Sequence, residues 1–177
     1  MDTNTLSAFD LLADAFDYPQ PGQLATLESE LNNLPAGMLT AGQKQAMGSF
    51  LSKIRLLKLG EWEELHTRTL DLNPPAAPYI GFQTWGESYQ RGEFMARMSR
   101  VLMETGVDND GELPDHLAPV LRYLARTDEP LPELVQTLTP AVQRILAVLR
   151  SADPGNPYID LLEAVRELCS NLKKEAA

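Results

Sequence analysis

The sequence predicts an all-α protein, a single-domain bundle of about eight or nine helices. In most segments apolar residues recur every three or four positions, with proline or glycine between segments, which is typical of amphipathic helices. No segment of four or more residues shows the strict alternation of a half-buried strand. A chain of 177 residues fits one domain that buries about 70% of its unfolded surface. We therefore expect residues 1–172 to form one domain of antiparallel helices, and residues 173–177 to form a frayed tail.

Four helices are expected in the first 70 residues. The first covers residues 5–16, where apolar residues repeat at helical spacing. The second opens at Pro21, the third has Thr40 as a suitable N-cap, and the short fourth follows Gly60. His66 lies on this fourth helix without a second ligand four residues later, so we expect a surface or boundary residue and no site there.

A proline-rich stretch, DLNPPAAPYIGFQTWG, occupies residues 71–86. Its prolines, Pro74, Pro75 and Pro78, predict a non-helical loop. The stretch has more apolar side chains than a solvated connector would have, and it is long for a compact domain. We therefore expect it to fold back on the protein or to form part of a surface that binds a partner.

The most regular helix is expected at residues 87–105, with one apolar and one charged face. On the charged face Glu93 and Arg97 stand four residues apart and are expected to pair. A turn at residues 108–111 follows, and the next helix is expected to start at Glu112.

Further helices are expected in the C-terminal part of the chain. One covers residues 133–138. Thr139 and Pro140 then indicate the N-cap and first-turn proline of a separate helix. Asn156 and Pro157 repeat this pattern at the start of the last helix.

The formal charge of -10 and the pI near 4.6 exclude nucleic acid as the expected partner and favour a basic one. No lysine or arginine precedes Lys44. General solubility is the alternative explanation for this acidity. With a single cysteine, Cys169, and two histidines without ligand spacing, we expect no disulfide and no metal site. The chain does not begin like a secretory signal, and no apolar run approaches the ~20 residues that span a bilayer, so we expect a cytoplasmic protein without membrane insertion.

Three stretches together resemble a known family. In order, they are PPAAPYIGFQTWGESYQRGEFMARM, ELPDHLAPVLRYLA and NPYIDLLEAVREL. They are similar to the delta-subunit, or NarJ-type, assembly chaperones of respiratory nitrate reductase, within the wider TorD/DmsD family of molybdoenzyme maturation chaperones. The resemblance covers nearly the whole chain, although the first sixty residues agree only in pattern. Glu112, Asp115 and His116 resemble the E-x-x-D-H motif of the TorD branch, whereas delta-subunit chaperones often have an aromatic residue in place of His116.

The resemblance implies a TorD-like fold and a non-catalytic cytoplasmic chaperone without a cofactor of its own. It implies binding to the N-terminal segment of a molybdoenzyme catalytic subunit, in the first place that of a respiratory nitrate reductase, to support cofactor insertion and assembly. One alternative is a proofreading chaperone for the twin-arginine signal peptide of another molybdoenzyme. Two others are a small helical hydrolase that acts through Asp115 and His116, and a scaffold that binds no enzyme subunit. Both a monomer and a domain-swapped dimer are compatible with the sequence.

Two groups of residues are the candidates for peptide binding. Aromatic and methionine side chains suit a groove for the apolar face of an amphipathic segment, and this group consists of Tyr79, Phe82, Trp85, Tyr89 and Met95. The resemblance adds Glu112, Asp115 and His116. The residues themselves favour a structural interpretation, in which Glu112 and Asp115 place negative charge at a helix N-terminus. No activated nucleophile or glycine-rich phosphate loop accompanies them, so neither catalysis nor nucleotide binding is expected.

Overall fold

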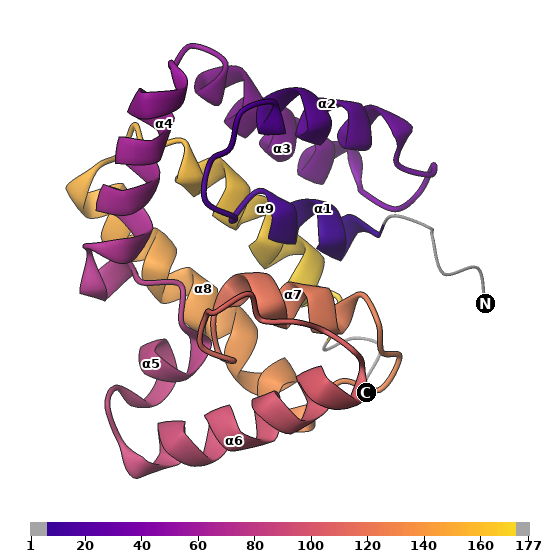
Figure 1. Cartoon of the computed structure of the whole chain (residues 1–177), viewed down its shortest axis with the longest axis vertical. Helices are drawn as coiled ribbons and strands as arrows, with labels where there is room; N and C mark the ends of the chain where they lie inside the picture. Colours follow the sequence, from indigo (N-terminus) through magenta and orange to yellow (C-terminus); the bar gives the residue numbers. More distant parts are fainter. Residues whose placement is uncertain (1–6, 173–177) are drawn as a thin grey trace.

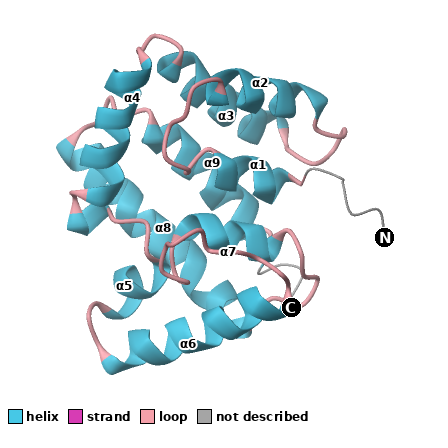
Figure 2. Cartoon of the chain, in the orientation of Figure 1, coloured by secondary structure: helices cyan, strands magenta, loops and turns pink. Residues whose placement is uncertain are grey.

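Residues 7–172 are described by the structure, a computed structural model. Its nine α-helices within these residues are α1 (Ala8–Asp14), α2 (Gln23–Asn33), α3 (Ala41–Ile54), α4 (Leu59–His66), α5 (Ile80–Trp85), α6 (Tyr89–Glu104), α7 (Leu117–Leu124), α8 (Pro132–Ala152) and α9 (Tyr158–Ser170). A π-helical turn (Thr67–Asp71) extends α4, and a 3₁₀ turn (Pro74–Ala76) precedes α5. No strand occurs in the described part of the chain (Figure 2), so the predicted all-α fold is confirmed.

The last two helices connect the two ends of the molecule. In Figure 1, α1 to α4 occupy one end and α5 to α7 the other, while α8 and α9 run between them. α9 lies against α3 and α8, α1 lies against α7, and α5 lies against α8 and α6. Because α1 and α7 come from different ends, their contact brings the N-terminal helices next to the segment that precedes α7.

An aromatic cluster lies at the centre of the core, around Tyr158 at the start of α9. The Tyr158 ring is fully buried, with its centroid 6.4 Å from that of Phe16 and 5.4 Å from that of Phe50. Its hydroxyl accepts a hydrogen bond from Nε1 of Trp62 at 3.2 Å. This one side chain therefore joins α3, α4 and α9 to the end of α1.

The predicted N-cap of α3 is confirmed. The Thr40 hydroxyl accepts a hydrogen bond from the Gln43 N–H at 3.2 Å, and the Gln43 side chain accepts one from the Thr40 N–H at 2.9 Å. This reciprocal pair is a capping box, which satisfies two amide groups that would otherwise lack a partner. The start of the predicted first helix at residues 5 and 6, and the predicted tail at residues 173–177, lie outside the described residues.

The prediction of a non-helical loop at residues 71–86 was wrong. Pro74 and Pro75 stand in the first positions of the 3₁₀ turn, where a helix needs no N–H donor. Pro78 precedes Tyr79, the N-cap of α5, so no proline falls inside that helix. The expectation that this stretch folds back on the protein is confirmed, because α5 packs against α8.

The predicted break at Thr139 and Pro140 was also wrong. α8 runs unbroken through Pro140, whereas a new helix was predicted to begin at Thr139. Leu138 and Ala141, on either side of this point, are both buried in the core. Their burial outweighs the one hydrogen bond that a proline cannot donate.

Arg97 on α6 has a different partner from the one predicted. Its Nε donates to Oε2 of Glu133 on α8 at 2.8 Å, so the ion pair joins two helices, whereas the predicted pair with Glu93 would have stayed within one. Among the described residues, every helix is too short or too polar to pass through a lipid bilayer.

Candidate functional site

The site begins where Tyr79 and His116 meet. These residues form an isolated antiparallel bridge, and their sequence neighbours supply two backbone hydrogen bonds of 2.8 Å each. The two rings are in edge-to-face contact, with 5.2 Å between centroids. The segment ELPDHL is therefore held against the start of α5, although the two are far apart in sequence.

Asp115 is fully buried and forms an ion pair with Arg91 of α6. Nε of Arg91 donates to Oδ2 at 2.9 Å, and Nη2 donates to Oδ1 at 3.3 Å. The guanidinium carbon lies 5.6 Å from the ring centroid of Tyr79 and 5.4 Å from that of Phe82, which is cation–π geometry. Asp115 was expected at the first turn of a helix, but α7 begins only at Leu117. Both of its carboxylate oxygens are used inside the protein by Arg91.

Glu112 lies in the turn before α7, which begins only at Leu117, so the predicted helix start at Glu112 was wrong. The Tyr79 hydroxyl donates a hydrogen bond to Oε2 of Glu112 at 3.1 Å. Burial, and secondly the negative charge of Glu112, raise the pKa of Tyr79 to about 12. The hydroxyl therefore remains a hydrogen-bond donor at neutral pH and holds the Glu112 side chain in place.

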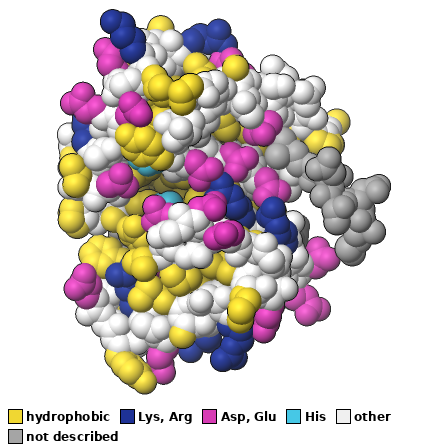
Figure 3. Space-filling model, viewed as in Figure 1, with side chains coloured by type: hydrophobic (Ala, Val, Ile, Leu, Met, Phe, Trp, Pro, Cys, Tyr) yellow, Lys and Arg dark blue, Asp and Glu magenta, His cyan; other side chains and the backbone are white. Residues whose placement is uncertain are grey.

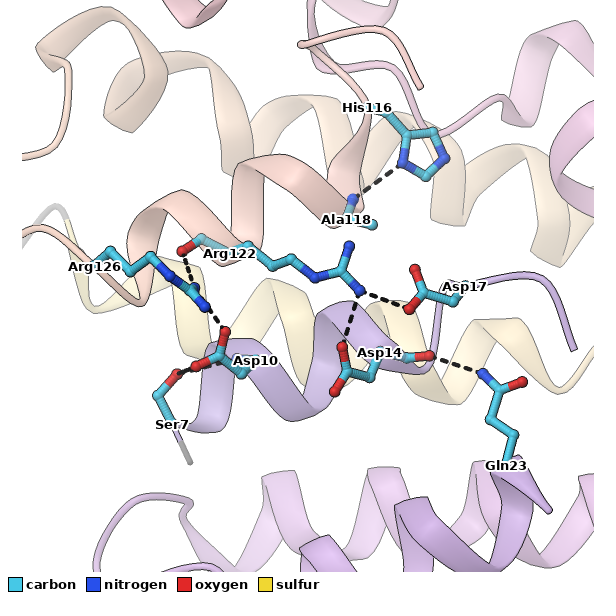
Figure 4. Close-up of polar contacts among 9 residues, drawn as sticks. All are labelled: Ser7, Asp10, Asp14, Asp17, Gln23, His116, Ala118, Arg122 and Arg126. Atoms are coloured by element: carbon cyan, nitrogen blue, oxygen red, sulfur yellow. Dashed lines mark hydrogen bonds and ion pairs between the residues drawn. The ribbon is translucent and has the colours of Figure 1, made fainter. Parts of the chain in front are cut away.

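His116 is the N-cap of α7. Its Nδ1 accepts a hydrogen bond from the Ala118 N–H at 3.1 Å (Figure 4). Burial lowers the pKa of His116 to about 4, so the ring is neutral at physiological pH. Because Asp115 gives its carboxylate to Arg91, it does not orient His116 as a general base would require, and the hydrolase alternative loses its basis.

His66 is a residue of the site that the sequence interpretation missed. It is buried, contrary to the expected surface or boundary position, and its Nδ1 lies 3.0 Å from the Tyr158 hydroxyl. Its ring meets that of Tyr18 edge to face at 5.4 Å. Burial lowers the pKa of His66 to about 4. The available signal was Trp62, a core residue four positions earlier and hence on the same helical face.

A pocket of about 340 Å³ lies between the α1–α2 connection, the π-helical turn and the segment before α7. His66 and His116 line it. Figure 3 shows histidine side chains within a hollow that has acidic and hydrophobic side chains at its edge. The charged side chains that line the pocket are Asp17, Asp71, Asp110, Glu112 and Arg122. The pocket is therefore acidic at its edge, with two neutral imidazoles within.

A second hollow of about 460 Å³ adjoins this pocket along the α1–α2 connection. The two share Asp17, Tyr18 and Gln20, and the second adds the carboxylates of Asp14 and Glu30. Burial raises the pKa values of Asp17, Glu30 and Asp71. Burial makes the charged form of these carboxylates less stable than it is in water. A cation bound beside them would stabilise that charged form.

Ion pairs between α1 and α7 hold one wall of the pocket. Nη2 of Arg122 lies 2.9 Å from Oδ1 of Asp14 and 2.6 Å from Oδ2 of Asp17. Nη1 of Arg126, just after the end of α7, lies 2.9 Å from Oδ1 of Asp10, one turn before Asp14 on α1 (Figure 4). The Arg122 side chain is only 15% exposed, so this pair is less screened than an ordinary surface pair.

None of the five apolar residues predicted to bind a peptide lines this pocket. Tyr79 is the N-cap of α5, and the other four lie on α5 and α6: Phe82, Trp85, Tyr89 and Met95. Trp85 packs on Phe94 with 5.2 Å between ring centroids, whereas Tyr89 is 80% exposed. Hydrophobic side chains gather over α5 beside the acidic hollow (Figure 3). The structure therefore brings Tyr79, Glu112 and His116 together and leaves the other four residues on α5 and α6, outside the pocket.

In fold and site, the chain is an all-helical protein with an acidic pocket beside an apolar surface, and no group of three or more potential metal ligands occurs among the described residues. A comparison with protein families matches residues 36–154 to the nitrate reductase delta subunit family. The match spans more than half of the 177 residues, so the chain belongs to this family, as the resemblance predicted. A search of curated proteins finds no match. Membership supports a role as a maturation chaperone of a molybdoenzyme rather than an enzyme.

Proposed function

We propose that the protein is a cytoplasmic chaperone that binds the N-terminal segment of a molybdoenzyme catalytic subunit, in the first place that of a nitrate reductase. Binding keeps this segment out of other contacts while the cofactor is inserted and before the subunit joins its partners. The family supports the class of client, and the acidic pocket supports the chemistry of the bound segment.

The observation that carries the proposal is the position of four carboxylates around one pocket, on Asp17, Asp71, Asp110 and Glu112. These residues come from three separate parts of the chain, and their convergence favours a site for a basic group over general surface acidity. A basic side chain of the bound segment would lie among them, and its charge would offset the burial of Asp17 and Asp71.

The apolar surface on α5 and α6 complements this pocket. An amphipathic segment has a basic face and an apolar face, and it needs neighbouring surfaces of both kinds. We assign four residues to contact with the apolar face of the bound segment: Phe82, Trp85, Tyr89 and Met95. Glu112 and His116 contact its basic face. Asp115 takes part only as a positioning residue, because its ion pair with Arg91 holds the ELPDHL segment in place.

Calorimetric titration with synthetic N-terminal peptides of the host's molybdoenzymes tests the proposal. We expect one peptide to bind with micromolar affinity or better. The double variant Asp71→Asn/Glu112→Gln should weaken that binding roughly tenfold, because it removes two charges from the pocket and leaves a hydrogen-bond acceptor for Tyr79.

The matched control is Asp128→Asn/Glu129→Gln. It also removes two negative charges, but from the exposed α7–α8 connection. It should bind as the wild type does. Equal losses in both double variants would mean that net charge alone governs binding, and the assignment of the pocket would fail. Peptides with and without a consecutive arginine pair distinguish the nitrate reductase client from the twin-arginine alternative.

A further inference from the structure

The hydrogen bonds around His66 determine which of its nitrogens carries the proton. Trp62 Nε1 is only a donor, so the Tyr158 oxygen accepts from it at 3.2 Å. Among the described residues, Nδ1 of His66, 3.0 Å away, is the one acceptor within reach of the Tyr158 hydroxyl, so its single proton points there. Nδ1 is therefore an acceptor, and in a neutral imidazole the proton must be on Nε2.

A different contact shows that His116 also carries its proton on Nε2. The Ala118 N–H donates to its Nδ1 at 3.1 Å. A neutral His116 therefore also carries its proton on Nε2, on the other side of the ring from α7 (Figure 4). Both rings are neutral at physiological pH, since burial lowers both pKa values to about 4.

Both Nε2–H groups belong to rings that line the acidic pocket. The residues are 5% and 6% exposed, and neither Nε2 has a hydrogen-bond partner among the described residues. Neither Nε2 is a fully buried atom without a partner, so both are open to the pocket and can donate to a bound acceptor.

We infer that the pocket binds a peptide carbonyl oxygen, which accepts hydrogen bonds from Nε2 of His66 and Nε2 of His116, beside a basic side chain that pairs with the surrounding carboxylates. A carbonyl oxygen has two lone pairs and so takes both donors. A carboxylate ligand is disfavoured, because Asp17, Asp71 and Glu112 would repel it. The inference rests on the proposed function for the identity of the bound peptide.

Two substitutions at His116 separate its role as a donor from its role as a helix cap. His116→Asn keeps an acceptor near the position of Nδ1, so α7 remains capped, but it has no group that reaches the position of Nε2. His116→Gln places an amide N–H near the position of Nε2 and loses the cap. In calorimetric titrations with the client peptide, His116→Asn should weaken binding roughly three- to tenfold with little change in the thermal midpoint. His116→Gln should bind within about threefold of wild type and unfold at a lower temperature.

A probe that does not depend on the client completes the test. Nitrogen NMR of the histidine rings should show Nε2 protonated in both residues of the free protein. N-acetyl-arginine methylamide, which has a carbonyl and a guanidinium group, should then shift both Nε2 signals, whereas N-acetyl-glutamate methylamide should not.

The outcomes distinguish this inference from the proposed function. If a client peptide binds wild type and His116→Asn equally well, the donor pair is wrong and the chaperone proposal stands. If no client peptide binds but the arginine probe shifts both Nε2 signals, the ligand chemistry stands and the chaperone proposal fails. A proton on Nδ1 of either ring, or signals that neither probe shifts, would overturn the inference.

Discussion

Gly81, on α5, lies against the Arg91–Asp115 ion pair. A Cβ atom at this position would be 2.7 Å from Oδ2 of Asp115 and 3.1 Å from Cγ of Arg91, so a side chain there must displace the pair. We expect Gly81→Ala to lower the free energy of unfolding by about 1–3 kcal/mol, as overpacking does in a buried site. Urea denaturation measures the change.

Gly92 provides the control for this substitution. It lies in the interior of α6, and a Cβ there would meet nothing within 4 Å. Gly92→Ala should therefore raise the free energy of unfolding by about 0.5–1 kcal/mol, because alanine favours the helix. If the two substitutions change stability in the same direction, steric contact with the ion pair is not the reason that residue 81 is glycine.

The two buried histidines make stability depend on pH. Their pKa values are about 4 in the folded protein against 6.5 for an unperturbed histidine, so the unfolded chain binds more protons between these values. The stability that they contribute is complete above about pH 6.5 and is lost as the pH falls towards 4. We expect the free energy of unfolding to decrease over this interval in denaturation curves recorded at each pH.

Other groups near the pocket titrate in the opposite sense. Asp17, Glu30 and Asp71 have raised pKa values, so they bind protons first in the folded state and oppose the loss. Comparison of wild type with His116→Asn isolates the histidine effect, because these carboxylates, Asp115 and Arg122 are present in both. The decrease between pH 6.5 and 5 should be smaller in the variant. An equal decrease would mean that His116 is not held neutral by its surroundings.

The helix α8 shows how tertiary packing overrides a local break signal. Pro140 cannot donate a hydrogen bond to the carbonyl of Gln136, and Gln136 is exposed, so that carbonyl can be solvated by water. We expect Pro140→Ala to raise the free energy of unfolding by about 1–2 kcal/mol, since it restores the bond at some cost in unfolded-state entropy.

Pro132 is the matched control on the same helix. It stands at the first helical position, where a proline loses no hydrogen bond. Pro132→Ala should leave stability unchanged within about 0.5 kcal/mol or lower it slightly. Urea denaturation of both variants measures the two changes in the free energy of unfolding. If Pro140→Ala is no more stable than Pro132→Ala, α8 accommodates Pro140 without cost.

The net charge of the whole molecule should govern how fast a basic peptide associates. The chain carries -10, with no lysine or arginine before Lys44, and its acidic N-terminal helices border the pocket. Stopped-flow measurements with a labelled client peptide should show an association rate that falls roughly tenfold between low and high salt, because salt screens the attraction. The dissociation rate should change less, since it depends on short-range contacts.

A peptide in which glutamine replaces the basic residues tests this charge effect. Its association rate should depend only weakly on salt, because it offers little positive charge to the acidic surface. The same steep dependence for both peptides would show that salt acts on the protein itself and not on the encounter.

Local sequence signals predicted the structure correctly at Thr40 and in α6, where a single physical cause determines the local conformation. Thr40 was identified as an N-cap because a threonine followed by glutamine three residues later satisfies the amides of a helix start. Periodicity located α6 because one of its faces is uniformly apolar. Prediction was wrong where two local interpretations competed. The prolines at residues 74–78 fit a loop and also a short helix start, and only packing against α8 distinguishes them.

The candidate site was predictable in part. ELPDHL and the aromatic stretch at residues 79–85 were recognised as its components, and the structure joins them through Tyr79 and His116. The burial of Asp115 and the part taken by His66 were not predictable. Both depend on side chains from other helices, Arg91 and Tyr158, whose approach no local spacing records.

By itself, the sequence determined the helical class, the family and the acidic character of this protein, because composition, periodicity and motif order are properties of the chain. Only the tertiary structure decided that Asp17, His66, Glu112 and His116 line one pocket. The physical reason is that helical periodicity specifies which face of each helix is buried, but not which helix covers it. The contact of α1 with α7, and the Tyr79–His116 bridge, make that choice for the site.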